Sequence, residues 1–515
     1  MWCNLKNILN GEKFKKIGLV AGPILFIIIV NYPVEGLSFE AKIVIGTTIW
    51  MISWWVSEAL PIYVTALVPL VIFPVFNVIP LDEITAKYAD KIIFLFLGGL
   101  MLAKAVEKSG LHKRFALNIL HKFGTNPRNI IAAFIIITGF ISAWMSNTAS
   151  AMLMIPIAAA VASQVHDEQK RSRFAVCLML SVAYAASLGG MATLIGTPPN
   201  AIFASLSKSL QDVDVSFSQW MLVGMPISAV SLFVLWVYMV NFGAKIDSSP
   251  LTEERHLIKR KLDELAGMTR NEKMVAAVFA ATAIAWVTRG LLWKDFIPLV
   301  DDSMIAIMAA IALFIIPSAK GKKQSASKLG MEMHDNDDLD SDAAERPSDP
   351  SHERSYAILD WKTAVTIPWG VLLLIGGGLA LASGFSATGL DEHIAKNLAF
   401  LQGVNYIVVI LVIVAVTIFA GEMISNTATA ALIIPVAATL ASSLSINPML
   451  LMVPVAVATS YGFMMPVGTP PNALAFATGH VTVPKMARAG IFMDLIGIAV
   501  VTVLTALLVP LVWGN

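Results

Sequence analysis

Two short polar motifs, each present twice, interrupt the apolar stretches of this chain. The triplet Ser-Asn-Thr occurs at 146–148 and 425–427, and the pentapeptide Gly-Thr-Pro-Pro-Asn occurs at 196–200 and 468–472. Paired prolines block the propagation of a helix and glycine allows unusual backbone dihedrals, so each pentapeptide should break a helix. A break leaves unpaired carbonyls at one half-helix end and unpaired amides at the other. Carbonyl, hydroxyl and side-chain amide oxygens suit a hard cation such as Na⁺, whereas free amides and helix N-termini suit an anion.

The segments that carry these motifs lack a fixed positive charge. No Lys or Arg lies in the apolar stretches 129–165, 174–207, 404–446 and 447–480. An anion bound there would need compensating charge from helix dipoles and from bound cations. This pattern predicts cotransport of a cation with an anionic substrate.

A single Ser-Asn-Thr triplet would more commonly be a packing feature, because Ser and Thr in membrane helices bond back to their own backbone and small residues let helices approach. The duplication beside duplicated helix breaks favours a binding role for Asn147, Thr148, Asn426 and Thr427. Glu422 is the only ionisable residue of its apolar segment, and an intramembrane carboxylate is a candidate functional group. Three interpretations of Glu422 stay open: it helps a cation site, carries a proton, or caps the turn of a hairpin.

Composition identifies the elements that must position these residues. Of the 515 residues, 57% are hydrophobic and 14% are charged, whereas soluble domains have about 25% charged residues. Apolar runs of membrane-spanning length recur from end to end, so we expect an all-α polytopic membrane protein with about 11 transmembrane helices and two re-entrant helical hairpins. Nothing indicates nucleic-acid binding, and Cys3 and Cys177 suggest neither a disulfide framework nor a metal site. The expected spans outside the motif-bearing segments are 17–32, 41–57, 60–80, 91–106, 217–241, 273–292, 302–318, 363–384 and 487–513.

Basic residues set the expected orientation, because Lys and Arg concentrate in cytoplasmic loops. Lys13, Lys15 and Lys16 place the N-terminus in the cytoplasm, and basic clusters on both sides of 129–165 place both ends of that segment there too. Its 37 residues are short for two spans of about 20 residues each, so it should form a re-entrant hairpin with its tip at Ser-Asn-Thr. Five expected crossings separate it from 404–446. The second hairpin should therefore enter from the outer face, and the C-terminus should lie outside.

The motifs belong to an internal repeat. The two triplets are 279 residues apart, and the same offset relates Gly-Gly-Leu at 98–100 to 377–379; the pentapeptides are 272 residues apart. Matched landmarks in the same order, with an odd number of crossings between them, predict an inverted-topology repeat, which is typical of secondary transporters that bind substrate at broken helices. We expect N-terminal scaffold helices in 1–90 and a first repeat core in 91–241, which contains the cytoplasmic-side hairpin 129–165 and the broken helix 174–207. Scaffold helices of the second repeat should follow in 242–318, and a disordered cytoplasmic linker in 319–358. The second repeat core should occupy 359–515, with the outer-side hairpin 404–446 and the broken helix 447–480.

On these residues the chain resembles the divalent anion:sodium symporter family of the INDY type. The resemblance rests on the two triplets, the two pentapeptides and the stretch WGVLLLIGGGLALA at 369–382, and it covers nearly the whole chain. It implies a homodimer of elevator-type transporters, in which a transport domain made of the hairpins and broken helices moves against a scaffold. We expect the protein in the lipid bilayer of the plasma (inner) membrane.

The resemblance also implies the binding residues. The substrate carboxylates would contact Asn147, Thr148, Asn426, Thr427, Thr469 and Pro470. One co-transported Na⁺ would bind Ser142, Ser146, Asn147 and Gly196, and a second would bind Ser425, Asn426 and Gly468. Ser142 stands four residues before the first triplet, but the matching residue before the second triplet is Gly421. Because the family usually has Ser or Thr there, the second sodium site should lack one side-chain ligand.

The leading interpretation is Na⁺-coupled symport of C4-dicarboxylates such as succinate, malate or fumarate. Gly421 keeps open a Na⁺-independent exchange of dicarboxylates or tricarboxylates, and sulfate and citrate are alternative substrates of the same mechanism. A passive anion channel is a more distant alternative, because opposed hairpins indicate alternating closure. No enzymatic activity is expected, since the spans show no His-Glu metal motif, no clear Ser/His pair and no carboxylate dyad.

Overall fold

The computed structural model describes residues 11–34, 36–123, 126–243, 259–265, 267–319, 357–397, 403–466 and 468–514. Within these residues the secondary structure is helical, and one isolated bridge pairs Pro317 with Ala357. The prediction of an all-α protein is thereby confirmed. The predicted disordered linker, 319–358, falls almost entirely outside the described residues.

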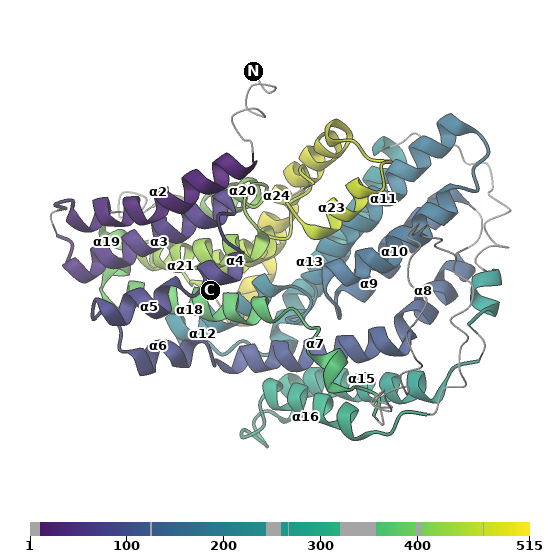
Figure 1. The fold of residues 1–515 in the computed structure, drawn as a ribbon, viewed down its shortest axis with the longest axis horizontal. Coiled ribbons are helices and arrows are strands. Elements are labelled where there is room, and N and C mark those ends of the chain that lie inside the picture. Colours follow the sequence, from purple (N-terminus) through teal and green to yellow (C-terminus); the bar gives the residue numbers. More distant parts are fainter. Residues whose placement is uncertain are drawn as a thin grey trace, which may run out of the picture.

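The N-terminal helices up to residue 87 lie together on one side of the molecule, and the two that follow run below its centre toward the opposite side (Figure 1). They are α2 (Gly11–Asn31), α3 (Phe39–Ser57), α4 (Ile62–Thr65), α5 (Val68–Val75), α6 (Leu81–Lys87), α7 (Lys91–Ser109) and α8 (Leu111–Lys122). The span predicted at 60–80 is divided into α4 and α5. Pro69 in the first turn of α5 has no amide to donate to the carbonyl of Thr65, so the helix cannot continue through this point.

Both predicted hairpins are present as pairs of helices joined at a Ser-Asn-Thr triplet. The first consists of α9 (Pro127–Ser142) and α10 (Asn147–Ala162), and the second of α20 (Tyr406–Gly421) and α21 (Asn426–Ser443). The arms have 16 or 18 residues, which at about 1.5 Å per residue gives about 24–27 Å, less than the roughly 30 Å of a bilayer core. The turns fall at the predicted tips.

Both predicted helix breaks are also present, and each second half begins at the first proline of the pentapeptide. The first broken helix consists of α11 (Glu168–Gly190) and α12 (Pro198–Gln211), and the second of α22 (Met449–Ala458) and α23 (Pro470–Ala477). Residues 191–197 form the first irregular link, and the described residues of the second are 459–466, 468 and 469. These links are mostly buried in protein, which is the setting that a broken backbone requires in a membrane.

The other helices surround these elements. They are α13 (Phe217–Tyr238) with the π-turn η1 (Met239–Gly243), α15 (Arg270–Thr288) with the π-turn η2 (Arg289–Trp293), α16 (Asp302–Ile315), α17 (Trp361–Ala364), α18 (Trp369–Ala387), α19 (Leu390–Asn397) and α24 (Val483–Trp513). Seven described helices are long and apolar enough to cross a membrane, and several shorter apolar helices accompany them. The number of about 11 crossings stays a prediction.

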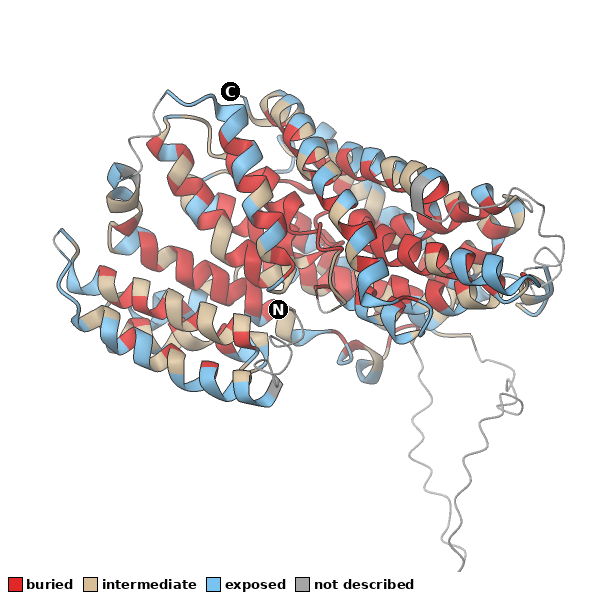
Figure 2. Cartoon of the chain, turned by 90° about the horizontal axis from the view of Figure 1, so that it is seen from above, coloured by how far each residue is buried: buried red, intermediate tan, exposed pale blue. Residues whose placement is uncertain are grey.

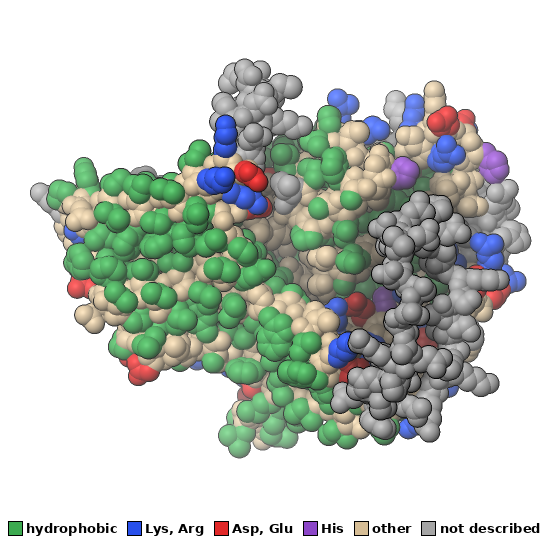
Figure 3. All heavy atoms as spheres, in the orientation of Figure 1, with side chains coloured by type: hydrophobic (Ala, Val, Ile, Leu, Met, Phe, Trp, Pro, Cys, Tyr) green, Lys and Arg blue, Asp and Glu red, His purple; other side chains and the backbone are tan. Residues whose placement is uncertain are grey.

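The first broken helix lies at the centre of the molecule and α2 at its edge. The apolar window of α11 is 89% buried, whereas that of α2 is 17% buried. Figure 2 shows the same contrast, with buried residues concentrated along the central helices. Figure 3 shows a continuous apolar surface over α2 and α3, with basic and acidic side chains along its upper edge. Such a surface fits contact with lipid.

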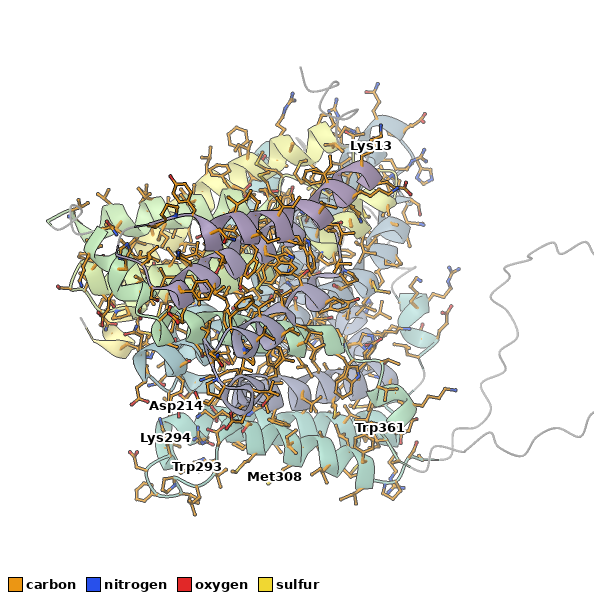
Figure 4. The ribbon with its side chains drawn as sticks, turned by 60° about the vertical axis from the view of Figure 1, so that its left-hand side comes forward. Lys13, Asp214, Trp293, Lys294, Met308 and Trp361 are labelled. Atoms are coloured by element: carbon orange, nitrogen blue, oxygen red, sulfur yellow. The ribbon has the colours of Figure 1, made fainter. Side chains whose placement is uncertain are left out.

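One ionic cluster ties the start of α7 to the segments that precede α13 and α16. Lys91 Nζ lies 2.8 Å from Asp214 Oδ1 and 3.3 Å from Asp301 Oδ2. Beside it, Arg289 of η2 donates to Asp302 across 3.0 Å. Figure 4 places Asp214 at the same end of the molecule as η2, whereas Trp361 lies toward the other end of α16. These bonds join helices that are far apart in the sequence.

Candidate functional site

Each Ser-Asn-Thr triplet starts the second arm of its hairpin. Ser146 and Ser425 are the N-caps, with φ and ψ of −62° and 144° in the first and −60° and 143° in the second. Their hydroxyl oxygens accept the amides of Ala149 (3.2 Å) and Ala428 (3.3 Å). The two tips are therefore one local structure used twice. Capping is a structural use of the two serines, and it leaves the neighbouring Asn and Thr side chains for other roles.

The Asn and Thr of each triplet are accessible in part. Asn147, Thr148, Asn426 and Thr427 are all half-buried. The hydroxyls of Thr148 and Thr427 make no side-chain hydrogen bond within the described part of the chain. Each can donate to an anion without breaking an existing bond.

The last residue of each pentapeptide locks the irregular link before it. Asn200 donates its side-chain amide to the carbonyls ten and seven positions earlier, at 3.1 and 2.7 Å. Asn472 donates to the carbonyls at the same two offsets, at 2.8 and 3.1 Å. Both side chains are fully buried, and the Oδ1 atom of each has no hydrogen-bond partner among the described residues. Our sequence-based prediction did not include this pair, and its only signal was the shared fifth position of the motif.

Three oxygens meet behind the first tip. Ser142 Oγ lies 2.7 Å from Asn147 Oδ1 and 2.6 Å from the carbonyl oxygen of Ala186, and the Ser142 side chain is fully buried. A hydroxyl has one proton, so it can donate in only one of these two contacts. The group is therefore electron-rich, which suits a hard cation with oxygen ligands.

The backbone approaches the same tip at two glycines. A Cβ atom at Gly190 would lie 2.3 Å from Asn147 Oδ1, and one at Gly196 would lie 2.3 Å from the Gly190 carbonyl oxygen. Only glycine allows such close approach. Of the predicted ligands of the first sodium site, Asn147 and Gly196 therefore lie against Gly190. Ser142 contacts Asn147 Oδ1, and Ser146 caps the helix that Asn147 begins.

The second tip has the same plan with one oxygen fewer. Gly421 supplies no hydroxyl, and Asn426 Oδ1 is buried without a hydrogen-bond partner among the residues described. A Cβ atom at Gly462 would lie 3.7 Å from Asn426 Oδ1 and 3.6 Å from the Gly421 carbonyl oxygen, and one at Gly468 would lie 3.6 Å from the Gly462 carbonyl oxygen. The predicted ligands Asn426 and Gly468 thus flank Gly462, with more space between them than in the first half.

Glu422 connects the second tip to the second break. Its carboxylate accepts the backbone amides of Met464 (2.8 Å) and Met465 (3.0 Å), and the side chain is buried. In the first half, Ala143 is equivalent to Glu422 and Thr193 to Met465. The contact between them is uncharged and therefore weaker: the Thr193 hydroxyl donates to the Ala143 carbonyl. The carboxylate of Glu422 therefore braces the irregular link, and within the described residues these side-chain hydrogen bonds go to that link and not to its own hairpin.

Asp494 of α24 lies against Glu422 and is fully buried. We expected no pair of carboxylates inside the spans, and this contact corrects that expectation. The two residues are 72 positions apart on different segments, so no sequence pattern indicated that they would meet. Gly490, one turn before Asp494, permits the approach of α24, since a Cβ there would lie 2.5 Å from the Phe463 backbone.

Four helix N-termini surround the two tips. α10 and α21 begin at the triplets, and α12 and α23 begin at the breaks. α10 packs against α23 and α12 packs against α21, so the second arm of each hairpin lies beside the helix that follows the break of the other half. Helix N-termini carry partial positive charge. The arrangement can hold cations on its carbonyl and side-chain oxygens and an anion on its amides and hydroxyls.

Sequence comparison finds relatives along the whole chain. Residues 13–514 match the family described as the sodium:sulfate symporter transmembrane region. The sodium-dependent dicarboxylate transporter SdcS of Staphylococcus saprophyticus is 39% identical over 508 residues, which cover 97% of this chain and 92% of that protein. The protein of the same name from Staphylococcus aureus strain USA300 is 37% identical over 508 residues, with the same two coverages.

Comparison with solved structures supports the fold. The YdaH transporter of Alcanivorax borkumensis gives a TM-score of 0.56 at 12% identity, with 84% of this chain and 88% of that chain covered. MtrF of Neisseria gonorrhoeae gives a TM-score of 0.51 at 12% identity, with 96% and 94% covered. The duplicated tips and breaks, the match along residues 13–514 and the 39% identity lead to one conclusion. The chain is an integral membrane protein of the sodium:sulfate symporter family, also called the divalent anion:sodium symporters.

Proposed function

We propose that this protein is a secondary active transporter that couples Na⁺ to the uptake of C4-dicarboxylates such as succinate, malate and fumarate. The observation that carries the proposal is the pair of equivalent tips, where oxygen clusters and helix N-termini meet without a Lys or Arg side chain in the segments concerned. The relatives named as sodium-dependent dicarboxylate transporters support the same substrate and the same cation.

Charge balance explains why the anion needs the cation. The N-terminus of a helix carries about half an elementary charge, so the two tip helices supply about one positive charge. A dicarboxylate carries two negative charges, and the imbalance cannot be left in a site shielded from water. Bound Na⁺ supplies the missing positive charge, which makes anion binding depend on Na⁺.

The proposed assignments follow the two halves of the site. The first Na⁺ takes Ser142, Ser146, Asn147 and Gly196, and the second takes Ser425, Asn426 and Gly468. The substrate carboxylates take Asn147, Thr148, Asn426, Thr427, Thr469 and Pro470. In support, the hydroxyls of Thr148 and Thr427 are uncommitted, and Asn426 Oδ1 has no partner among described residues.

The movement that we propose is of the elevator type. The hairpins and broken helices would move as a transport domain against a scaffold that includes the N-terminal helices, in a homodimer in the plasma membrane. The positions of basic residues support a cytoplasmic N-terminus and an outer C-terminus.

Uptake into liposomes tests the proposal. Purified protein is reconstituted, and labelled succinate uptake is measured with and without an inward Na⁺ gradient. We expect concentrative uptake only with the gradient, and loss of uptake in Asn147→Ala and Asn426→Ala. Asn397→Ala is the matched control, because that side chain is exposed and bonds only to its own helix. Full uptake in both tip variants would contradict the assignment.

Gly421 supports a second candidate, which is exchange of two organic anions without Na⁺. In support, Gly421 supplies no hydroxyl where the first half has Ser142, and Asn426 Oδ1 has no hydrogen-bond partner among the described residues. Uptake that needs preloaded succinate and ignores external Na⁺ would favour exchange. Labelled sulfate and citrate, tested in the same vesicles, distinguish the substrate classes.

A further inference from the structure

A cavity of about 1100 Å³ opens between α11, α13 and α24. None of the candidate ligands of Na⁺ or substrate lines it. Most of its wall is apolar, and it includes Leu180, Phe233, Phe492 and Ile496. Phe233 is 61% exposed and Phe492 is 53% exposed, so more than half of each of these large apolar side chains is not covered by protein. In a membrane such a groove is filled by lipid chains.

Three basic side chains line the same cavity. Arg173 is the sixth residue of α11, and Lys485 and Arg488 are the third and sixth residues of α24. All three are exposed, and none makes a side-chain hydrogen bond or ion pair within the described segments. By contrast, Arg114 and Arg289 are held by carboxylates. No acidic residue among those that the structure describes lines the cavity, so the described part of its wall does not compensate its cationic charge.

Charge and apolar surface are separated along the helices. On both α11 and α24 the basic residues come in the first two turns, and the apolar lining residues follow them. Arg488 and Ile496 are eight residues apart, which is about 12 Å along a helix. A soluble dianion would satisfy the cations but leave the apolar wall uncovered. A phospholipid with an anionic headgroup satisfies both, and basic pockets between membrane helices are known to hold such headgroups.

We propose that this groove binds an anionic glycerophospholipid, whose phosphate lies on Arg173, Lys485 and Arg488 and whose acyl chain lies along α11, α13 and α24. The helices concerned also support the candidate transport site. α11 is the first half of a broken helix, and α24 carries Asp494 beside Glu422. A bound lipid therefore contacts the elements that would move in transport. The lipid site does not depend on which anion the protein carries.

The test compares lipid selectivity in the full-length protein. Spin-labelled phosphatidylglycerol and phosphatidylcholine are added to the reconstituted protein, and the immobilised fraction of each gives their relative association constants. The test variant is Arg173→Gln/Lys485→Gln/Arg488→Gln. The control variant, Lys113→Gln/Lys362→Gln/Lys396→Gln, removes the same charge from exposed positions outside the cavity.

We expect wild type and the control variant to prefer phosphatidylglycerol. Near a membrane surface each Lys or Arg contributes about fivefold to the binding of an anionic lipid, so the test variant should lose at least tenfold of this preference. Equal preferences in the two triple variants would overturn the proposal, because the cations would then act only as general surface charge.

A second variant tests the acyl-chain part independently of the cations. Val237→Trp places a large side chain in the groove and should reduce the immobilised fraction of both labelled lipids. An unchanged fraction would overturn the placement of the chain. Displacement of the labelled lipid by soluble glycerol phosphate, at concentrations that match the lipid, would assign the cations to a soluble anion and would also overturn it.

Discussion

Replacing Gly421 by Ser tests whether the second tip binds a cation as the first tip would. Gly421 occupies the position of Ser142 and has no positive φ, so a side chain is conformationally allowed. A Cβ atom there meets nothing closer than the Thr459 carbonyl oxygen at 4.0 Å. The new hydroxyl would reach toward Asn426 Oδ1, which has no partner among the described residues, as Ser142 Oγ reaches Asn147 Oδ1 at 2.7 Å.

The substitution has two separable effects. A hydroxyl adds one neutral oxygen to the cation site, and an interaction of this kind contributes about 1 kcal/mol, which is about fivefold in an equilibrium constant. Independently, replacing Gly in a helix by a residue with a Cβ atom stabilises the fold by about 0.5–1 kcal/mol. Gly421→Ala supplies the second effect without the first and is therefore the matched control.

The assay is the Na⁺ dependence of labelled succinate uptake into liposomes. We expect the half-saturating Na⁺ concentration to fall about fivefold in Gly421→Ser and to stay unchanged in Gly421→Ala. Ser142→Ala should raise it at the first site. Equal Na⁺ dependence of the Ser and Ala variants at position 421 would refute the view that a hydroxyl at this position is a sodium ligand.

Three further predictions concern the supports of the site. Asn200→Ala and Asn472→Ala each remove two bonds to buried carbonyls, so thermal unfolding should show a loss of about 2–3 kcal/mol, whereas the exposed control Asn397→Ala should change little. Glu422→Ala leaves two amides without an acceptor, so the free energy of unfolding should fall by about 3 kcal/mol. Glu422→Gln keeps one acceptor oxygen and should lose less. A wild-type melting curve for Glu422→Ala would contradict the bracing role. Burial would raise the pKa of Asp301, but a backbone amide and its ammonium partner outweigh burial and hold that pKa below 3.8. This stabilisation is complete above the unfolded-state pKa and is lost as the pH falls through the folded-state pKa, so acid should lower the melting temperature of wild type more steeply than that of Asp301→Asn.

The parts of the fold that the sequence predicts well are those whose causes are local. A serine that caps a helix and a pair of prolines that break one act within a few residues of themselves. The tips at 146–148 and 425–427 and the breaks at 196–200 and 468–472 are therefore where the sequence places them. The division of the span predicted at 60–80 also has a local cause, which is its prolines. We predicted one continuous span there because the apolar run is long enough for one.

The contacts that were not predicted depend on the tertiary packing of the chain. Asn200 bonds to carbonyls seven and ten residues earlier only because the link between α11 and α12 folds back on itself. These carbonyls then lie beside the first turn of α12, which carries Asn200. Asp494 meets Glu422 only because α24 packs against α20 of the second hairpin and, at Gly490, against the irregular link at Phe463. No pattern in the sequence indicates such returns, since the residues concerned are separated by a break or belong to different helices.

The two halves of the repeat are alike in backbone and differ in how each tip is joined to its break. In the first half a side-chain hydroxyl, that of Ser142, reaches both the tip and the broken helix, and the Thr193 hydroxyl adds a second neutral contact. In the second half Gly421 removes the hydroxyl, and the carboxylate of Glu422, at the position next to it, accepts two amides of the broken segment instead. The lost neutral ligand and the gained carboxylate therefore occur at adjacent positions. Hydrogen bonds to a carboxylate are about twice as strong as neutral ones. The exchange can therefore keep the second tip in place while Asn426 Oδ1 stays without a partner among the described residues and open to a cation.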